Sequence, residues 1–426
     1  MREPGGPFSR DCVRLWAIVA LAVTICSGLT GPWTALGADQ NQASETVRPE
    51  VGNPLQAAQE LIKAHKYKQA LAKIQEADSA KDKTAYEAYV IERLRGIAAA
   101  GAGEVDLAAR SFESTIASGR LSAPDKLKMM EATAELYARA KDYPHAIAWA
   151  SRYLKEGGTS EEVRRVLIQA YYLSGDCSGA EKELHAELHA DESAGRAPPE
   201  DRLQLLASCY LQQADKPRYA AALEELVTYY PKQEYWAELI YRIQTKPGFS
   251  PRLGLDVYRL KLALGISSSA SQFVEMTQLA LQAGFPVEAK SIIDRGFALG
   301  VLGVGADAER QRRLRELATK SAAQDQKTLG QSEEQAAASA KDGTGLVNTG
   351  FAYVVGGQID KGIDLMEGGI RKGGLKHPDD AKLHLGIAYL RGGQKEQAMQ
   401  TFKSVQGTDG AADLARLWIL YARRAT

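Results

Sequence analysis

A pattern of apolar and small residues recurs along most of this chain and limits the folds it can adopt. Each copy has an apolar helical segment, a tight turn, and a second helical segment that carries a small residue followed by an apolar one. The clearest copy is LHLGIAYLRGGQKEQAMQTFKSV, residues 383–405, where Gly392 and Gly393 separate the two segments. One pair of short amphipathic helices cannot bury its own apolar face, so the pattern predicts that successive pairs stack.

The small residue of the second segment recurs at a nearly regular interval. It stands at positions 70, 108, 146, 180, 220, 254, 289, 362 and 398, so most steps are between 34 and 40 residues and one is 73. A period of about 34 residues with two helices per unit resembles the tetratricopeptide repeat, and the resemblance covers residues 54–425. It implies an all-α fold, a right-handed superhelical solenoid of antiparallel helix pairs, with the first helix of each pair lining a concave face.

The step of 73 residues spans a segment that is helical in composition but poor in apolar residues. Its apolar face consists of Leu314, Leu317, Ala318 and Leu329. Two interpretations follow: a cryptic tenth helical pair, or an exposed helical linker that divides the solenoid into two arms. The predicted organisation is a signal peptide (1–38), a flexible leader (39–53), an N-terminal array of about seven repeats (54–303), the cryptic pair or linker (304–342), and C-terminal repeats with a capping helix (343–426).

The first 38 residues have the layout of an export signal. Arg2, Arg10 and Arg14 precede an uncharged run from residue 15 to residue 38, whose apolar part ends at Leu29. The run closes on small residues at 35–38, as in a cleavable secretory signal peptide. We therefore expect an exported protein, periplasmic or secreted. It would contact a membrane only if the signal stayed uncleaved as an anchor, and Gly28 shortens the apolar run below the length of a spanning helix.

Charge and motif content argue against several functional classes. The chain has 53 basic and 53 acidic residues, and removal of residues 1–38 changes the net charge only to −1. A nucleic-acid binder needs a positive field, so no nucleic-acid partner is predicted. The glycines at 300–305 follow a helical pattern and form no dinucleotide fingerprint, and no Gly-x-Ser-x-Gly is present. We predict no catalytic residues, no enzyme activity and no small-molecule cofactor.

Two residue pairs have spacings that merit inspection. His185 and His189 lie four residues apart on one predicted helix face, but no third ligand is evident nearby, so no metal site is predicted. Cys177 and Cys209 fall on helices expected to be neighbours. Both a disulfide and two buried thiols remain open for this pair.

The resemblance to tetratricopeptide repeats also assigns side chains to the concave face. Placing the repeats in register gives Arg93, Glu131, Glu135, Arg139, Arg165, Gln169, Tyr172, Gln204, Ser208, Tyr241, Gln278, Asn348, Phe351, His384 and Arg391. This mixture of polar and aromatic residues suits an extended peptide or a protein helix. Tyr172, Tyr241 and Phe351 are the expected anchors, because aromatic residues dominate interface energetics. The Lys and Asn clamp with which some family members bind a terminal carboxylate is missing.

The predicted function is that of an exported, non-enzymatic scaffold or adaptor that binds another protein or peptide in its groove. Two alternatives belong to other classes. One is a membrane-associated structural subunit of an envelope export or polysaccharide assembly. The other is an envelope hydrolase without a recognisable motif.

Overall fold

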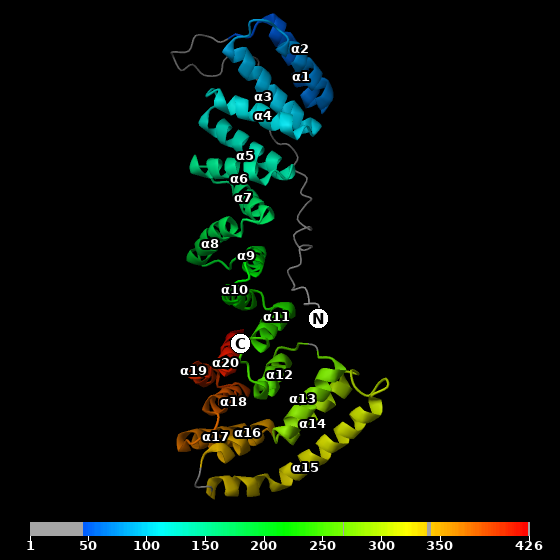
Figure 1. Cartoon of the computed structure of the whole chain (residues 1–426), viewed down its shortest axis with the longest axis vertical. Helices are drawn as coiled ribbons and strands as arrows, with labels where there is room; N and C mark the ends of the chain where they lie inside the picture. The colour runs from blue at the N-terminus through cyan, green and yellow to red at the C-terminus, as the bar shows by residue number, and fades with distance from the viewer. Residues whose placement is uncertain (1–45, 267, 339–341, 425–426) are drawn as a thin grey trace. The chain divides into compact units, whose positions relative to one another are not determined.

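The computed structural model describes residues 46–266, 268–338 and 342–424. Every regular element within these ranges is a helix, so the predicted all-α class is confirmed (Figure 1). The predicted signal peptide and the first part of the predicted leader lie outside the described residues. Among the described helices, none combines the length and the apolar character that crossing a membrane requires. The described chain divides into two compact units between Lys216 and Pro217.

The N-terminal unit consists of helices joined in pairs by short turns. They are α1 (Pro49–Lys63), α2 (Tyr67–Asp78), α3 (Ala85–Ala102), α4 (Val105–Ala117), α5 (Ala123–Arg139), α6 (Tyr143–Lys155), α7 (Glu161–Ser174), α8 (Cys177–Ser193) and α9 (Glu200–Gln212). Helices α1, α3, α5 and α7 each pack against the second helix of their pair, and each second helix packs against the first helix that follows it. In addition, α1 contacts α3, and α5 contacts α7. First helices of successive pairs therefore lie side by side at these two places.

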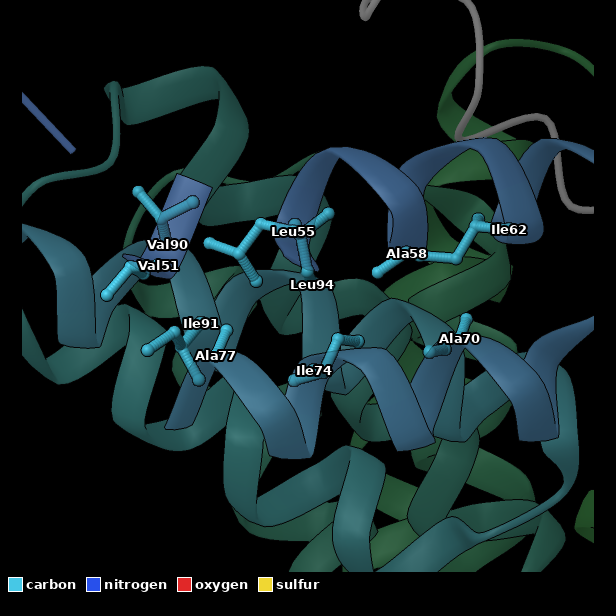
Figure 2. Packing of buried hydrophobic residues seen from close by; sticks show 11 residues of the cluster. Val51, Leu55, Ala58, Ile62, Ala70, Ile74, Ala77, Val90, Ile91 and Leu94 are labelled. Carbon is cyan, nitrogen blue, oxygen red and sulfur yellow. The ribbon is translucent and has the colours of Figure 1, made fainter. Parts of the chain in front are cut away.

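The core of the first repeats shows why stacking is required. Leu55 of α1, Ile74 of α2 and Ile91 of α3 point into one cluster (Figure 2), and each has at most 1% of its surface exposed. Burying a side chain of this size contributes roughly 1.5–3 kcal/mol. Since α3 belongs to the second pair, the first pair buries its apolar face only by contacting its neighbour.

The small residues of the repeat pattern lie where helices cross. Six of them have no exposed surface: Ala70, Ala108, Ala146, Ala180, Ala289 and Ala398. Two copies depart from the pattern, since Ala220 is only half-buried and Gly254 stands at the first residue of its helix. The prediction of packing at these positions is confirmed for the regular repeats.

The predicted leader is too long, because α1 begins at Pro49 rather than after residue 53. Val51 is fully buried, and Arg48 at the helix start is tied to Glu87 of α3. The Arg48 guanidinium donates from Nε and Nη2 to the two carboxylate oxygens of Glu87, at 2.9 Å each. Glu87 also accepts from the backbone N–H of Thr84 and forms a capping box that starts α3.

This contact predicts that acid loosens the first repeat. Hydrogen bonding from Arg48 lowers the pKa of Glu87 from 4.5 to about 2. A lowered pKa stabilises the fold above pH 4.5, and that stabilisation is lost as the pH falls from 4.5 towards 2. Glu87→Gln is expected to cost about 1–3 kcal/mol at pH 7 and to flatten this pH dependence. Amide exchange of α1 at pH 7 and pH 3 measures both effects.

The matched control for this prediction is Glu60→Gln on α1. Glu60 forms an exposed ion pair with Lys63, three residues later on the same helix, and exposed ion pairs of this kind contribute little to stability. Equal losses in the two variants, or an unchanged pH profile for Glu87→Gln, would contradict the assignment.

The C-terminal unit, residues 217–424, includes all but the first residue of α10. Its helices are α10 (Lys216–Tyr229), α11 (Gln233–Gln244), α12 (Gly254–Ala263), α13 (Ala270–Gln282), α14 (Pro286–Ala298), α15 (Ala308–Ala338), α16 (Thr344–Val355), α17 (Ile359–Lys372), α18 (Pro378–Arg391), α19 (Lys395–Lys403) and α20 (Ala411–Arg424). The short 3-10 helix Pro251–Leu253 precedes α12. Helix α20 buries Leu414, Leu417 and Trp418, packs against α18 and α19, and also contacts α12.

The segment 304–342 forms neither of the predicted structures. It contains one helix, α15, which packs against α14 and α16 and buries Gln311, Ala318, Ala322 and Ala336. A second helix of a pair is missing because no turn interrupts residues 308–338. A dividing linker is also wrong, since the boundary between the two compact units falls at residue 216.

The two ends of the C-terminal unit are joined by ionic contacts, which we call the clasp: Lys246, Ser250, Arg252, Asp380, Asp409 and Asp413. Arg252 donates to both oxygens of Asp380, at 2.8 and 3.0 Å, and also bonds Asp409. The backbone N–H of Ser250 donates to the carbonyl of Asp409 at 2.8 Å, and Lys246 pairs with Asp413 at 2.8 Å. These partners lie more than a hundred residues apart in sequence, so this unit is held together by more than nearest-neighbour stacking.

Candidate protein-binding surface

Two neighbouring first helices of the N-terminal unit present the predicted groove residues in parallel rows. Helix α5 carries Glu131, Glu135 and Arg139 at four-residue spacing, so they share one face. Helix α7 carries Arg165 and Gln169 in the same way, and the next residue in that row is Leu173. Helices α5 and α7 contact each other directly, and the Ser160 hydroxyl before α7 bonds Glu131 of α5, so we treat the two rows as one candidate surface.

The acidic residues of this surface are incompletely balanced. Burial raises the pKa of Glu135, and the like charge of Glu131 adds to the effect, although Arg139 opposes it from 3.3 Å. Glu131 accepts a hydrogen bond from the Ser160 hydroxyl at 2.7 Å. A cation from a partner would relieve the repulsion between the two carboxylates.

Leu173 is the apolar feature of the same surface, and the sequence analysis did not select it. Its side chain is 41% exposed, which makes it one of few large apolar residues left open to solvent in the described chain. Leu173 follows Gln169 by four residues, and this spacing alone would have placed it on the same helix face as the predicted groove residues. It supplies an apolar contact beside the polar rows.

Two of the three predicted aromatic anchors are buried, so their assignment as anchors is wrong. Tyr172 is 7% exposed, and its hydroxyl shares a 2.7 Å hydrogen bond with Ser208, which is also buried. Phe351 is fully buried. Both aromatic rings pack between helices. Successive residues of a first helix point in different directions, so one residue can face the groove while the next faces the neighbouring repeat. Tyr241, on α11, is 43% exposed and remains available.

Phe351 belongs to a charged and aromatic core within the C-terminal unit. The Arg259 guanidinium lies over the Phe351 ring at 4.6 Å and over the Phe285 ring at 5.2 Å. His384 stacks on the other predicted groove residue, Phe351, with ring centres 4.9 Å apart. The predicted groove residues Phe351 and His384 therefore do lie together. They pack inside the unit against other side chains of the chain and do not line an open groove.

The ion pairs of this core were missed by sequence reasoning. Arg259 binds both oxygens of Glu288, at 2.9 and 2.6 Å, and Asp256 at 2.7 Å. All three are at most 5% exposed. Burial alone would raise the pKa of Asp256, but His384 at 2.9 Å and Arg259 outweigh it and lower that pKa. The sequence shows Asp256 and Arg259 three residues apart, a spacing that suits an ion pair on one helix. Their burial, however, depends on helices that are distant in sequence.

The remaining predicted groove residues are dispersed. Arg93 and Gln204 are half-buried and contact residues of their own helices, Tyr89 and Glu200. Three others are exposed on first helices of the C-terminal unit: Gln278, Asn348 and Arg391.

The histidine and cysteine pairs have local structural roles. His185 shares a 2.9 Å hydrogen bond with the Tyr210 hydroxyl, and no group of three or more potential metal ligands occurs within the described ranges. Cys177 and Cys209 are free and buried, so the alternative of two buried thiols describes this structure. The Cys177 thiol faces the Gln212 amide oxygen at 3.6 Å, and burial raises the pKa of Cys209.

Sequence comparison identifies the repeats. Residues 93–161 match one description of the tetratricopeptide repeat, and residues 203–232 and 380–408 match another. The chain contains tetratricopeptide repeats. The matched segments contain α4, α5, α6, α10 and α19 in full and most of α9 and α18, so they fall in both compact units. Tetratricopeptide repeats form interaction scaffolds that present extended surfaces to other proteins.

Solved tetratricopeptide and related structures resemble this repeat protein at low identity. A tetratricopeptide repeat protein from Parabacteroides merdae is 11% identical, covering 78% of this chain and 98% of its own, with a TM-score of 0.28. Yeast Tom70 is 10% identical, covering 88% and 95%, with a TM-score of 0.25. A structure of Naa15/Naa10 bound to HypK-THB is 16% identical, covering 86% and 59%, with a TM-score of 0.33. No curated protein matches this repeat protein significantly.

Proposed function

We propose that this protein is a non-enzymatic scaffold whose N-terminal unit binds a segment of another protein along the rows of α5 and α7. The observation that carries the proposal is the combination of Glu131, Glu135 and exposed Leu173 on two adjacent first helices. Glu131 and Glu135 repel each other, and Arg139 pairs with Glu135 only, so a Lys or Arg from the partner is favoured beside them; Leu173 favours an apolar residue near it. An extended peptide or a short helix can supply both.

The C-terminal unit supports this choice of surface. Its predicted groove positions 351 and 384 are occupied by internal stacking and by the Arg259 ion pairs. A peptide entering there would have to displace buried, mutually satisfied charges. The N-terminal rows need no such displacement.

We also propose that the scaffold acts after export, in the periplasm or outside the cell. The basic start, apolar run and small residues of 1–38 support this location. Fractionation of cells with and without residues 2–38 tests it: the full-length chain is expected outside the cytoplasm, and equal retention of both forms in the cytoplasm would refute export.

Leu173→Asp is expected to weaken partner capture from an envelope extract about tenfold or more, because it removes an apolar contact and adds a negative charge to a surface that already carries Glu131 and Glu135. Tyr229→Asp is the matched control, since Tyr229 is 40% exposed on α10 and belongs to the C-terminal unit. Quantitative mass spectrometry of captured proteins is the measurement. Partners that remain bound to Leu173→Asp, or are lost equally from Tyr229→Asp, would refute the proposed surface.

A further inference from the structure

Helix α15 is the element that the repeat pattern does not explain, and its outer face has an unusual composition. The buried positions Gln311, Ala318 and Ala322 define the face that packs on the neighbouring repeats. Residues two positions later lie about 200° around the helix, on the opposite side. Those positions are Arg313, Lys320 and Gln324, and all three are exposed.

The outer face contains two rows of residues at seven-residue spacing. One row is Arg310, Leu317 and Gln324, and the other is Arg313, Lys320 and Lys327. Seven residues is the spacing at which one helix keeps a constant face towards a second helix. We call these six residues the α15 outer rows.

The cations of the α15 outer rows outnumber the acid beside them: exposed Glu316, three residues after Arg313 and four before Lys320, forms no ion pair with either. Arg310, Arg313, Lys320 and Lys327 are exposed, and none forms an ion pair or hydrogen bond with any other described part of the chain. Neighbouring basic residues behave differently, since Arg312 pairs with Glu309 and Arg315 with Asp294. The chain as a whole has no net charge, so this excess is local.

An apolar contact lies within the same rows. Leu317 is 53% exposed and sits between the four cations. A single leucine provides too little apolar surface to insert a helix into a lipid interface. It suits the seam between two helices, where a few apolar contacts are flanked by charge pairs.

We propose that the α15 outer rows bind an acidic helix of a partner protein, at a second site separate from the N-terminal rows. Carboxylates at heptad spacing on the partner would face Arg310, Arg313, Lys320 and Lys327, and an apolar residue would contact Leu317. The cations lie roughly 5–10 Å apart along the helix, which is the spacing of successive heptad positions on a partner.

The test uses the full chain and a labelled alanine-based peptide of about 28 residues with glutamates in two heptad rows and one leucine between them. A second peptide has the same composition in shuffled order. Fluorescence anisotropy at about 50 mM salt is expected to show binding of the first peptide, at least tenfold weaker binding of the shuffled one, and weakening with added salt.

Variants place the binding on α15. Arg313→Glu with Lys320→Glu is expected to weaken binding at least tenfold, and Leu317→Ala about three- to tenfold. Lys68→Glu with Lys128→Glu makes the same change in net charge at exposed sites of the N-terminal unit and should leave binding unchanged. Arg313→Gln with Lys320→Gln gives a second measure if charge reversal lowers helicity.

Three results would overturn the proposal: no peptide binding, equal affinity for the two peptides, or equal loss in the Lys68 and Lys128 control. Vesicles of four parts phosphatidylcholine to one part phosphatidylglycerol provide the other arm. Vesicle binding that depends on the α15 outer rows, without discrimination between the peptides, would assign this face to an anionic membrane instead.

Discussion

Arg259→Ala is expected to destabilise the C-terminal unit by about 3–5 kcal/mol, because it leaves buried Glu288 without its counterion and Asp256 with His384 alone. Arg259 makes three hydrogen bonds of 2.6–2.9 Å to Asp256 and Glu288 and contacts the faces of two phenylalanine rings. Amide exchange of α12, α14 and α16 measures the loss. The N-terminal unit should keep its protection, since repeats are stabilised mainly by their neighbours.

Two companion variants separate charge from packing. Arg312→Ala removes an exposed arginine paired with Glu309 and is expected to change stability by less than about 0.5 kcal/mol. Replacing Asp256, Arg259 and Glu288 together by Leu, Met and Met is expected to restore most of the stability, because an apolar core avoids the cost of burying charges. A triple variant as unstable as Arg259→Ala would show that the ring contacts, not the unpaired carboxylates, carry the effect.

Gly350→Val is expected to disrupt the α16–α17 pair, at a cost near the upper end of about 1–3 kcal/mol or beyond it. A Cβ at Gly350 would lie 2.6 Å from the carbonyl oxygen of Gly362 and 2.9 Å from the backbone nitrogen of Met366. Backbone atoms cannot rotate away as side chains do, so the two helices must separate. Thermal unfolding followed by amide exchange of these helices measures the loss.

Gly368→Ala on the same helix pair is the control for this prediction. A Cβ at Gly368 meets no atom within 4 Å, and the residue lies inside α17. Alanine there is expected to be neutral or stabilising by about 0.5–1 kcal/mol, because glycine weakens a helix interior. Similar destabilisation by both substitutions would contradict the close backbone approach at Gly350.

The repeat pairs were predictable from sequence because their cause is local. Small residues at 70, 108 and 146 recur at the helix crossings, and Thr84 with Glu87 marks a helix start by a capping box. Close approach takes different forms, however. Gly350 meets the backbone at Gly362, whereas Gly386 leaves room for the ring of Phe402.

The departures from prediction arise from contacts between distant segments. Tyr172 and Phe351 have the spacing of groove residues, but adjacent helices cover them. The helical periodicity of the sequence is the same for a residue that faces the groove and for one that faces the next repeat, so it cannot separate the two. The composition of 308–338 predicts helix without saying whether a turn interrupts it. The clasp joins Arg252 to Asp380, and no local pattern indicates that pairing.

Site-specific photo-crosslinking tests most directly where the partner binds. Gln169 on α7 and Asn348 on α16 are both exposed polar residues at predicted groove positions, one in each unit. With a photoreactive phenylalanine analogue at one position at a time, the full chain is exposed to envelope extract and irradiated. We expect a specific crosslinked partner from position 169 and none from position 348. Crosslinking of that partner from position 348, and not from position 169, would contradict the account.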